Sequence, residues 1–484
     1  MKLFHVFAVV ALVTAIPSKA ESPRLKIYTR PADTVYTAEV NVVAVTEPEA
    51  KAYINGEDMH VFPTGSFGMP VQVKPGVNTI TVRVGKDGET TQKTFTVFRA
   101  DESSRPKKNI EVDESTTMFV NPFSVETLSG AYLQYGNGDD RLGGSKMGFI
   151  DENIILKVIG RKGSLYCVRL AADRLAYIPK VYTRPVADNP EVVNTGSWQI
   201  NNIGDADRVT ISLPRRLAYQ YFTDIDPQTI YIDLFGATDN SNWMTQRTLD
   251  LGIIDYVDFR QISDDVYRVI IRLKGKYQWG FHVGYEGKVL TVDVRHAPRS
   301  LKLKDLTIGL DAGHGGKYPG AISPSGLKEK DLNLDIVLRL KDLLEKRGAK
   351  VVLTRDSDIG PSMAERKKVW RDAKVDLAVS VHNNSGGSPF SAPGTAVLYK
   401  HLFDRMLAEC VARRLLQTGV NFFGLVGNFN FSLNGPTEFP NVLVEGLFMS
   451  SLEEESRLAD PSYRQLMAEK IVAAITDYLN QASK

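Results

Sequence analysis

The sequence predicts a multidomain protein in which all-β N-terminal modules precede a C-terminal α/β domain with a mostly parallel sheet flanked by helices. The chain has 484 residues, which is too long for a single domain with one hydrophobic core. Residues 25–298 contain short runs of alternating apolar and polar residues separated by turn signals, which is typical of β-strands. After residue 299, strand-like runs alternate with helical stretches, and this order favours a parallel α/β sheet.

The first twenty residues have the pattern of a secretory signal peptide. Lys2 supplies a positive charge, residues 4–16 are largely apolar, and the small residues Ser18 and Ala20 precede a cleavage position before Glu21. The apolar run is shorter than the about 20 residues that a membrane-spanning helix needs. We therefore expect export to the periplasm or cell envelope, with no stable membrane insertion after signal cleavage.

Residues 24–100 and 112–187 are predicted to form two separate β modules. The first contains strand-like runs broken by turn signals at 75–76 and 87–88, which predicts a small β-sandwich. It resembles the immunoglobulin-like modules of exported bacterial proteins. A charged linker with Pro106 follows, and the short strands of the second module resemble an SH3-like β-barrel.

Residues 190–299 form a third predicted β region. The order Arg-Val-x-Ile at 208–211, Ile-Asp-Leu-Phe-Gly at 232–236 and Tyr-Arg-Val-x-x-Arg-Leu at 267–273 is similar to the AMIN module. That resemblance implies that this region directs an attached enzyme to the cell wall. None of the β regions shows His, Cys or paired carboxylates at the spacing of metal ligands.

The C-terminal region, residues 304–484, is predicted to hold the chemistry. The expected strands are residues 307–310, 351–353, 377–381, 395–399 and 442–444, and the expected helices are residues 329–346, 363–373, 402–416 and 463–479. Ligands of α/β sheets bind at strand ends. His314 follows the first strand, His382 follows the third, and Glu445 ends a later strand. Glu329 opens the first helix, 15 residues after His314.

Two imidazoles and a carboxylate are a ligand set for catalytic zinc, which leaves a fourth position for water. Glu445 then fits the role of the carboxylate that transfers the water proton. A single strand-end histidine more often has a structural hydrogen bond, and Glu329 alone would be explained by the helix dipole. All four residues in this order favour a site.

The region resembles the zinc-dependent N-acetylmuramoyl-L-alanine amidases. The matching segments are 311–316, 319–321, 329–334, 353–358, 380–384 and 440–445. The resemblance implies that His314, Glu329 and His382 bind Zn2+ and that Glu445 is catalytic. It also implies that the substrate is peptidoglycan, cut between N-acetylmuramic acid and L-alanine, with a further wall or envelope partner for the β modules.

Two alternatives remain open: a zinc peptidase that cuts within the stem peptide, and a non-catalytic wall-binding protein. Leu447 and Ser451 stand where the family usually has Gly and Asn, which affects only local loop geometry. Residues 386–394 are too few to form the inhibitory helix that some relatives insert there. Nucleic-acid binding is not predicted, because 59 basic residues nearly cancel 57 acidic ones.

Overall fold

The computed structural model describes residues 21–105, 115–136, 146–240 and 243–483. The predicted signal peptide, residues 1–20, lies outside the described residues. The chain divides into two compact units, residues 1–105 and 106–484, and each is described by itself. Among the described helices, none has the length and apolar character needed to cross a membrane.

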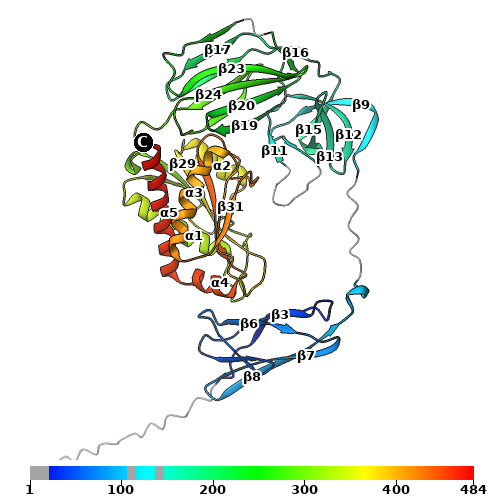
Figure 1. Cartoon of the computed structure of the whole chain (residues 1–484), viewed down its shortest axis with the longest axis vertical. Coiled ribbons are helices and arrows are strands. Elements are labelled where there is room, and N and C mark those ends of the chain that lie inside the picture. The colour runs from blue at the N-terminus through cyan, green and yellow to red at the C-terminus, as the bar shows by residue number, and fades with distance from the viewer. Residues whose placement is uncertain (1–20, 106–114, 137–145, 241–242, 484) are drawn as a thin grey trace, which may run out of the picture. The chain divides into compact units, whose positions relative to one another are not determined.

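The first unit consists of two sheets whose apolar faces enclose one core (Figure 1). Their strands are β1 (Lys26–Thr29), β3 (Glu39–Val45) and β6 (Ser66–Gln72) in one sheet, and β2 (Thr34–Val35), β8 (Glu89–Arg99), β7 (Gly76–Lys86), β4 (Lys51–Ile54) and β5 (Glu57–Met59) in the other. Alternate residues such as Ile80 and Val82 point into the core because successive strand side chains face opposite sides. The immunoglobulin-like assignment stays a prediction.

The second unit begins with a seven-stranded antiparallel sheet. In sheet order its strands are β11 (Lys146–Phe149), β10 (Tyr132–Gln134), β14 (Arg174–Pro179), β13 (Leu165–Ala171), β12 (Ile155–Lys162), β9 (Thr117–Thr127) and β15 (Thr183–Val186). Its core includes Val125 and Val168 and extends to Phe235 of the following region. Cys167 is buried here, and Cys410 is buried far along the chain; both are free thiols. The SH3-like assignment stays a prediction.

Two further sheets pack face to face over residues 198–295. The strands are β22 (Met244–Gln246), β17 (Trp198–Asn202), β18 (Ala206–Ile211), β26 (Val289–Arg295) and β25 (Phe281–Glu286) in one, and β19 (Tyr219–Ile225), β20 (Gln228–Phe235), β24 (Val266–Leu273) and β23 (Ile254–Ser263) in the other. In each sheet an arginine pairs with an aspartate on the neighbouring strand. Arg208 makes two hydrogen bonds to Asp293, and Arg268 makes two to Asp233.

The C-terminal domain is built on a six-stranded sheet in the order β28, β27, β29, β32, β30, β31. The strands are β27 (Thr307–Ala312), β28 (Lys350–Leu353), β29 (Leu377–Asn384), β30 (Thr395–Leu398), β31 (Phe422–Val426) and β32 (Asn441–Phe448). The first four in sheet order are parallel, and β30 runs antiparallel to β32. The predicted mostly parallel sheet is therefore confirmed.

Helices cover both faces of this sheet, as Figure 1 shows. They are α1 (Glu329–Glu345), α2 (Met363–Asp372), α3 (Arg405–Leu415), α4 (Leu452–Ala459) and α5 (Pro461–Ala482). α1, α3 and α5 pack on one face around Val379 and Val444, whereas Trp370 of α2 packs on the other face against Ala378. β29 is buried on both faces, which explains its continuous apolar run.

The C-terminal domain and the preceding β region each place an aromatic residue in the core of the other. Trp279, from the segment between β24 and β25, lies in the main core of the C-terminal domain, with its ring 5.9 Å from Tyr478. In return, Phe403 lies in the β core, 6.2 Å from the ring of Phe281. Gly280 has a positive φ, and a Cβ there would overlap the backbone of Glu438. The two regions are therefore joined by close packing.

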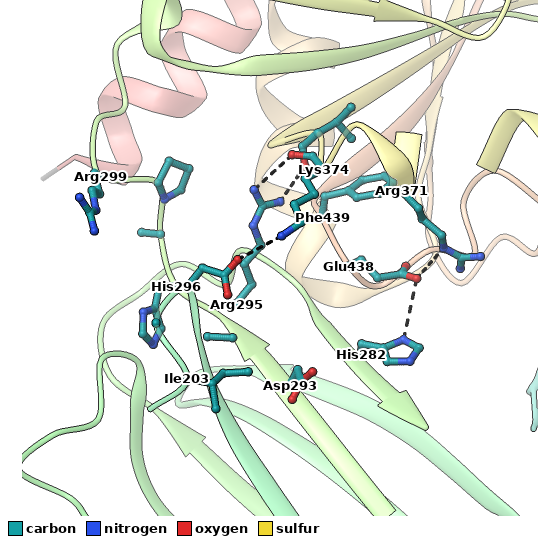
Figure 2. A pocket seen from close by; sticks show the side chains of 16 residues that line it. Ile203, His282, Asp293, Arg295, His296, Arg299, Arg371, Lys374, Glu438 and Phe439 are labelled. Atoms are coloured by element: carbon teal, nitrogen blue, oxygen red, sulfur yellow. Dashed lines mark hydrogen bonds and ion pairs between the residues drawn. The ribbon is translucent and has the colours of Figure 1, made fainter. Parts of the chain in front are cut away.

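A cleft lies at this junction, and the charges that line it are largely paired (Figure 2). Arg295 donates to Val375 O and pairs with Asp376, both at 2.6 Å. Arg371 pairs with Glu438 at 2.6 Å. These contacts lie just before β29 and β32, at the N-terminal ends of the parallel strands.

Candidate metal centre

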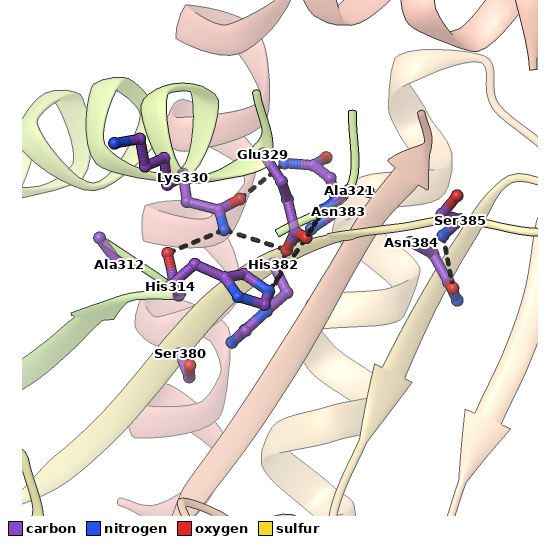
Figure 3. Close-up of polar contacts among 12 residues, drawn as sticks. Ala312, His314, Ala321, Glu329, Lys330, Ser380, His382, Asn383, Asn384 and Ser385 are labelled. Atoms are coloured by element: carbon purple, nitrogen blue, oxygen red, sulfur yellow. Dashed lines mark hydrogen bonds and ion pairs between the residues drawn. The ribbon is translucent and has the colours of Figure 1, made fainter. Parts of the chain in front are cut away.

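Three predicted ligands meet at the C-terminal ends of the parallel strands (Figure 3). His314 follows β27 in a left-handed conformation with φ of 61°. Glu329 is the first residue of α1, and His382 lies near the end of β29. Gly313 is required beside them, because a Cβ at this position would overlap the His382 ring. Gly320 has the same role, since a Cβ there would overlap the Glu329 carboxylate.

The donor atoms of this group converge closely. One ligand atom from each of the three residues lies within 4.8 Å of the other two. Glu329 Oε2 lies 3.0 Å from His314 Nε2, and Glu329 Oε1 lies 3.0 Å from His382 Nδ1. Among the described residues, this is the one group of His, Cys and acidic side chains close enough to hold a metal ion.

The electrostatics of the site keep the Glu329 carboxylate ionised. Burial raises the pKa of the Glu329 carboxyl, but hydrogen bonds with His314 and His382 outweigh burial and hold this pKa well below its usual range. Burial lowers the pKa of His382, whereas its hydrogen bond with Glu329 and the nearby Glu445 charge raise it more. A buried carboxylate is thus held in its ionised form between two imidazoles.

Two buried arginines hold the loop that carries His314. Arg355 donates to Ala312 O at 2.8 Å and to Gly313 O at 3.0 Å. Arg366 donates to His314 O at 2.6 Å and pairs with Asp311 at 2.6 Å. The loop is therefore fixed by hydrogen bonds that the two charged side chains donate to its backbone oxygens.

Glu445 lies beside the ligand group and outside it. It is directly opposite His382 in the pairing of β32 with β29. Its side chain is 9% exposed, and its buried Oε2 has no hydrogen-bond partner among the described residues. Burial raises the pKa of this carboxyl to about 7, with the His382 charge opposing and the Glu329 charge adding to the rise. A carboxyl group with this pKa exchanges protons readily near neutral pH.

Other polar residues near the site have structural partners. Asn384 Oδ1 accepts from Ser385 N at 2.8 Å, which is a loop-capping contact. Asn383 is buried, and its side chain contacts Asn333 rather than the open side of the site. Asn333 contacts the site although no motif of the sequence predicts a role for it there; its spacing of four from Glu329 places both residues on one helix face. Residues 385–394 contain no helix, in agreement with the predicted short loop.

The site combines an α/β sheet with a His–Glu–His group that could hold a metal ion and a buried glutamate beside it at the strand ends, an arrangement typical of metal-dependent hydrolases. A family model for N-acetylmuramoyl-L-alanine amidases matches residues 308–477, and a model for the AMIN domain matches residues 198–294. The chain belongs to the N-acetylmuramoyl-L-alanine amidase family. The predicted resemblances to this family and to the AMIN module are confirmed.

Several individual proteins are similar to the C-terminal part of the chain. The chain is 34% identical over 184 residues to an endolysin of Bacillus phage SPP1, a match that spans 37% of this chain and 67% of the endolysin. It is 30% identical over 219 residues to the N-acetylmuramoyl-L-alanine amidase AmiC of Neisseria meningitidis serogroup B, over 36% of this chain and about half, 52%, of AmiC. The solved N-acetylmuramoyl-L-alanine amidase AmiC2 of Nostoc punctiforme is 34% identical with a TM-score of 0.35, over 36% of this chain and 97% of that chain.

Proposed function

We propose that the protein is an exported zinc amidase that hydrolyses the bond between N-acetylmuramic acid and the L-alanine of the stem peptide in peptidoglycan. The observation that carries the proposal is the convergence of His314, Glu329 and His382 at one strand edge, with Glu445 beside them. Peptidoglycan hydrolysis agrees with the family to which the chain belongs.

The donor set fits zinc. Zinc takes nitrogen and oxygen ligands in a tetrahedral arrangement, and catalytic sites use three protein ligands and leave the fourth position open. Two imidazoles and one buried carboxylate supply these ligands, and the low pKa of Glu329 keeps its carboxylate ionised. When bound, zinc would activate a water molecule and polarise the scissile carbonyl.

Glu445 is assigned the proton transfer. Its Oε2 has no hydrogen-bond partner among the described residues, so it is available to accept a proton from the attacking water and to return it to the leaving nitrogen. Because Glu445 does not belong to the three-residue ligand group, its loss should leave the metal in place.

The AMIN region is assigned to wall binding, and residues 1–20 to export. This assignment rests on the AMIN match at 198–294 and on the signal-peptide pattern of the sequence. The enzyme would then act in the periplasm or cell envelope.

Digestion of purified sacculi by the mature chain tests the proposal, with the products identified by mass spectrometry. Free lactyl groups on the glycan and free amino-terminal alanine on the peptide are expected, and both should disappear on chelation and return with zinc. The matched pair is Glu445→Gln, which should be inactive, and Glu453→Gln, an exposed glutamate paired with Arg457 that should be fully active. Cuts within the stem peptide would instead identify a peptidase, and intact sacculi a wall-binding protein.

A further inference from the structure

Two buried asparagines flank the ligand group from different elements. Asn333 lies one helical turn after Glu329 on α1, so both side chains lie on the same helix face. Asn383 follows His382 on β29. Asn333 is 0% exposed and Asn383 is 2% exposed. A buried amide is costly unless it is hydrogen-bonded, so its partners indicate what it is placed to hold.

The two amides form a chain of hydrogen bonds that begins at the metal-binding carboxylate. Asn333 Nδ2 donates to Glu329 Oε1 and to Gly313 O, each at 3.2 Å. Asn383 Nδ2 then donates to Asn333 Oδ1 at 2.8 Å. The backbone N–H of Asn383 also donates to Glu329 Oε1 at 3.2 Å. Glu329 Oε1 is therefore held from both the helix and the strand.

This chain of hydrogen bonds ends on the strand that carries Glu445. Asn383 Oδ1 accepts from Leu447 N at 3.2 Å, two residues after Glu445 on β32. Gly446 lies between them, and a Cβ at Gly446 would contact Asn383 Oδ1 at 2.6 Å. The close approach of this strand to the Asn383 amide thus requires a glycine at 446.

We propose that Asn333 and Asn383 are positioning residues that orient the Glu329 carboxylate toward the metal and fix its distance from Glu445. The inference rests on the proposed zinc-dependent function. Groups that hydrogen-bond metal ligands set the orientation of those ligands, and their loss typically lowers metal affinity about 10–100-fold. Here one chain of hydrogen bonds runs from Glu329 Oε1 through the two asparagines to Leu447 N, and we call it the relay. The relay connects the metal-binding carboxylate to the strand that carries the proton-transferring carboxylate.

Zinc affinity, measured by competition with a chromophoric chelator on the mature chain, tests the proposal. We expect Asn333→Ala and Asn383→Ala each to weaken zinc binding about 10–100-fold. The double variant should be little weaker than the more affected single variant, because both substitutions break the same chain of bonds. At saturating zinc, Asn383→Ala should lower kcat for a soluble muropeptide with little change in KM, since the Glu445 strand loses its tether.

The matched control is Asn441→Ala, which removes an equally buried asparagine at the opposite end of β32. Its side chain donates to Pro436 O and Phe439 O, far from the metal edge. It should lower the melting temperature and leave zinc affinity and kcat unchanged. If Asn383→Ala does not fold, Asn333→Ala breaks the relay at its other end.

Two results would overturn the relay. One is a lower melting temperature with unchanged zinc affinity, which would mean that the asparagines only pack. The other is additive losses in the double variant, which would mean that they act separately. A wild-type chain that takes up no zinc in the same titration would instead overturn the proposed function and the relay together.

Discussion

Replacing Trp279 by Ala should destabilise the catalytic domain, although Trp279 lies within the AMIN match. The side chain is 2% exposed and belongs to the same core as α1, α3 and α5. Substitution of a core Trp by Ala costs about 3–5 kcal/mol. Burial of about 150–250 Å² of aromatic surface at about 25 cal/mol/Å² corresponds to about 4–6 kcal/mol. We therefore expect a loss of about 4 kcal/mol in the free energy of unfolding.

Urea unfolding of the mature chain measures this loss, and hydrogen–deuterium exchange locates it. Amides of α5 should exchange faster in the Trp279→Ala variant, because Tyr478 of α5 packs against the indole. The control is Trp243→Ala, whose side chain is 68% exposed in the same β region and should change stability by no more than about 0.5 kcal/mol.

Exchange that increases only within residues 198–295, with α5 unchanged, would refute the shared core. Equal effects of the two tryptophan substitutions would refute it as well. If the shared core holds, a fragment of residues 304–484 lacks Trp279 and leaves Phe403 without its β partners. Such a fragment should then be less stable than residues 190–484 by an amount similar to the Trp279→Ala loss.

Three further predictions concern single residues. Glu445→Gln should lower turnover roughly 10²–10⁴-fold and keep the zinc content of the wild type, whereas Glu329→Ala should lower both turnover and zinc content. Activity assays and metal analysis measure the two quantities, and the opposite pattern would reverse the two roles. Gly320→Ala should weaken zinc binding, since its Cβ would overlap the Glu329 carboxylate, and an unchanged chelator titration would contradict this. Burial raises the pKa of Asp207, but N–H groups including those of Ile254 and Gly252 outweigh it and lower this pKa. Asp207→Asn should therefore destabilise the AMIN region at neutral pH, and its difference from wild type should shrink as pH falls below about 4, because the carboxylate stabilises only while ionised. Unfolding curves at pH 7 and pH 3 that show a constant difference would contradict the role of this charge.

The catalytic domain was predictable because its signals are local. Its helices have apolar residues at helical spacing, and its buried strands are continuous apolar runs. The ligand residues follow strand ends, and parallel strands bring these ends together without further information. The convergence of His314, Glu329 and His382 therefore follows from the parallel arrangement of the strands, which the order of strands and helices along the chain already predicts.

Two elements of this domain were missed for physical reasons. β31 (Phe422–Val426) is a short edge strand with exposed phenylalanines and Gly424, so it shows neither burial nor a regular alternation. α4 (Leu452–Ala459) has only two helical turns, and three consecutive glutamates in its first turn hide its apolar face. The predicted helix 402–416 begins instead with a 3-10 turn at Leu402–Asp404, which places Phe403 in the neighbouring core.

Contacts between distant segments could not be predicted from the sequence. Trp279 and Phe403 are apolar residues that must be buried somewhere, but periodicity does not say against which domain. The same limit applies to Asn333 and Asn383, whose motifs match the family while their shared hydrogen bond depends on how α1 meets β29. The contacts of buried side chains depend on the tertiary structure, and local sequence patterns do not predict them.

The direction of the sheet separates the packing contact of the AMIN region from the metal ligands. The AMIN region packs at the N-terminal ends of the parallel strands through Arg295, whereas the metal ligands lie at their C-terminal ends. β29 has eight residues, and at about 3.3 Å per residue it separates these ends by roughly 25 Å. The AMIN region therefore meets the catalytic domain at the edge opposite the metal ligands and supplies no residue to the ligand group. Wall binding by this region should accordingly raise the apparent affinity for polymeric sacculi and leave the turnover of a single soluble muropeptide unchanged.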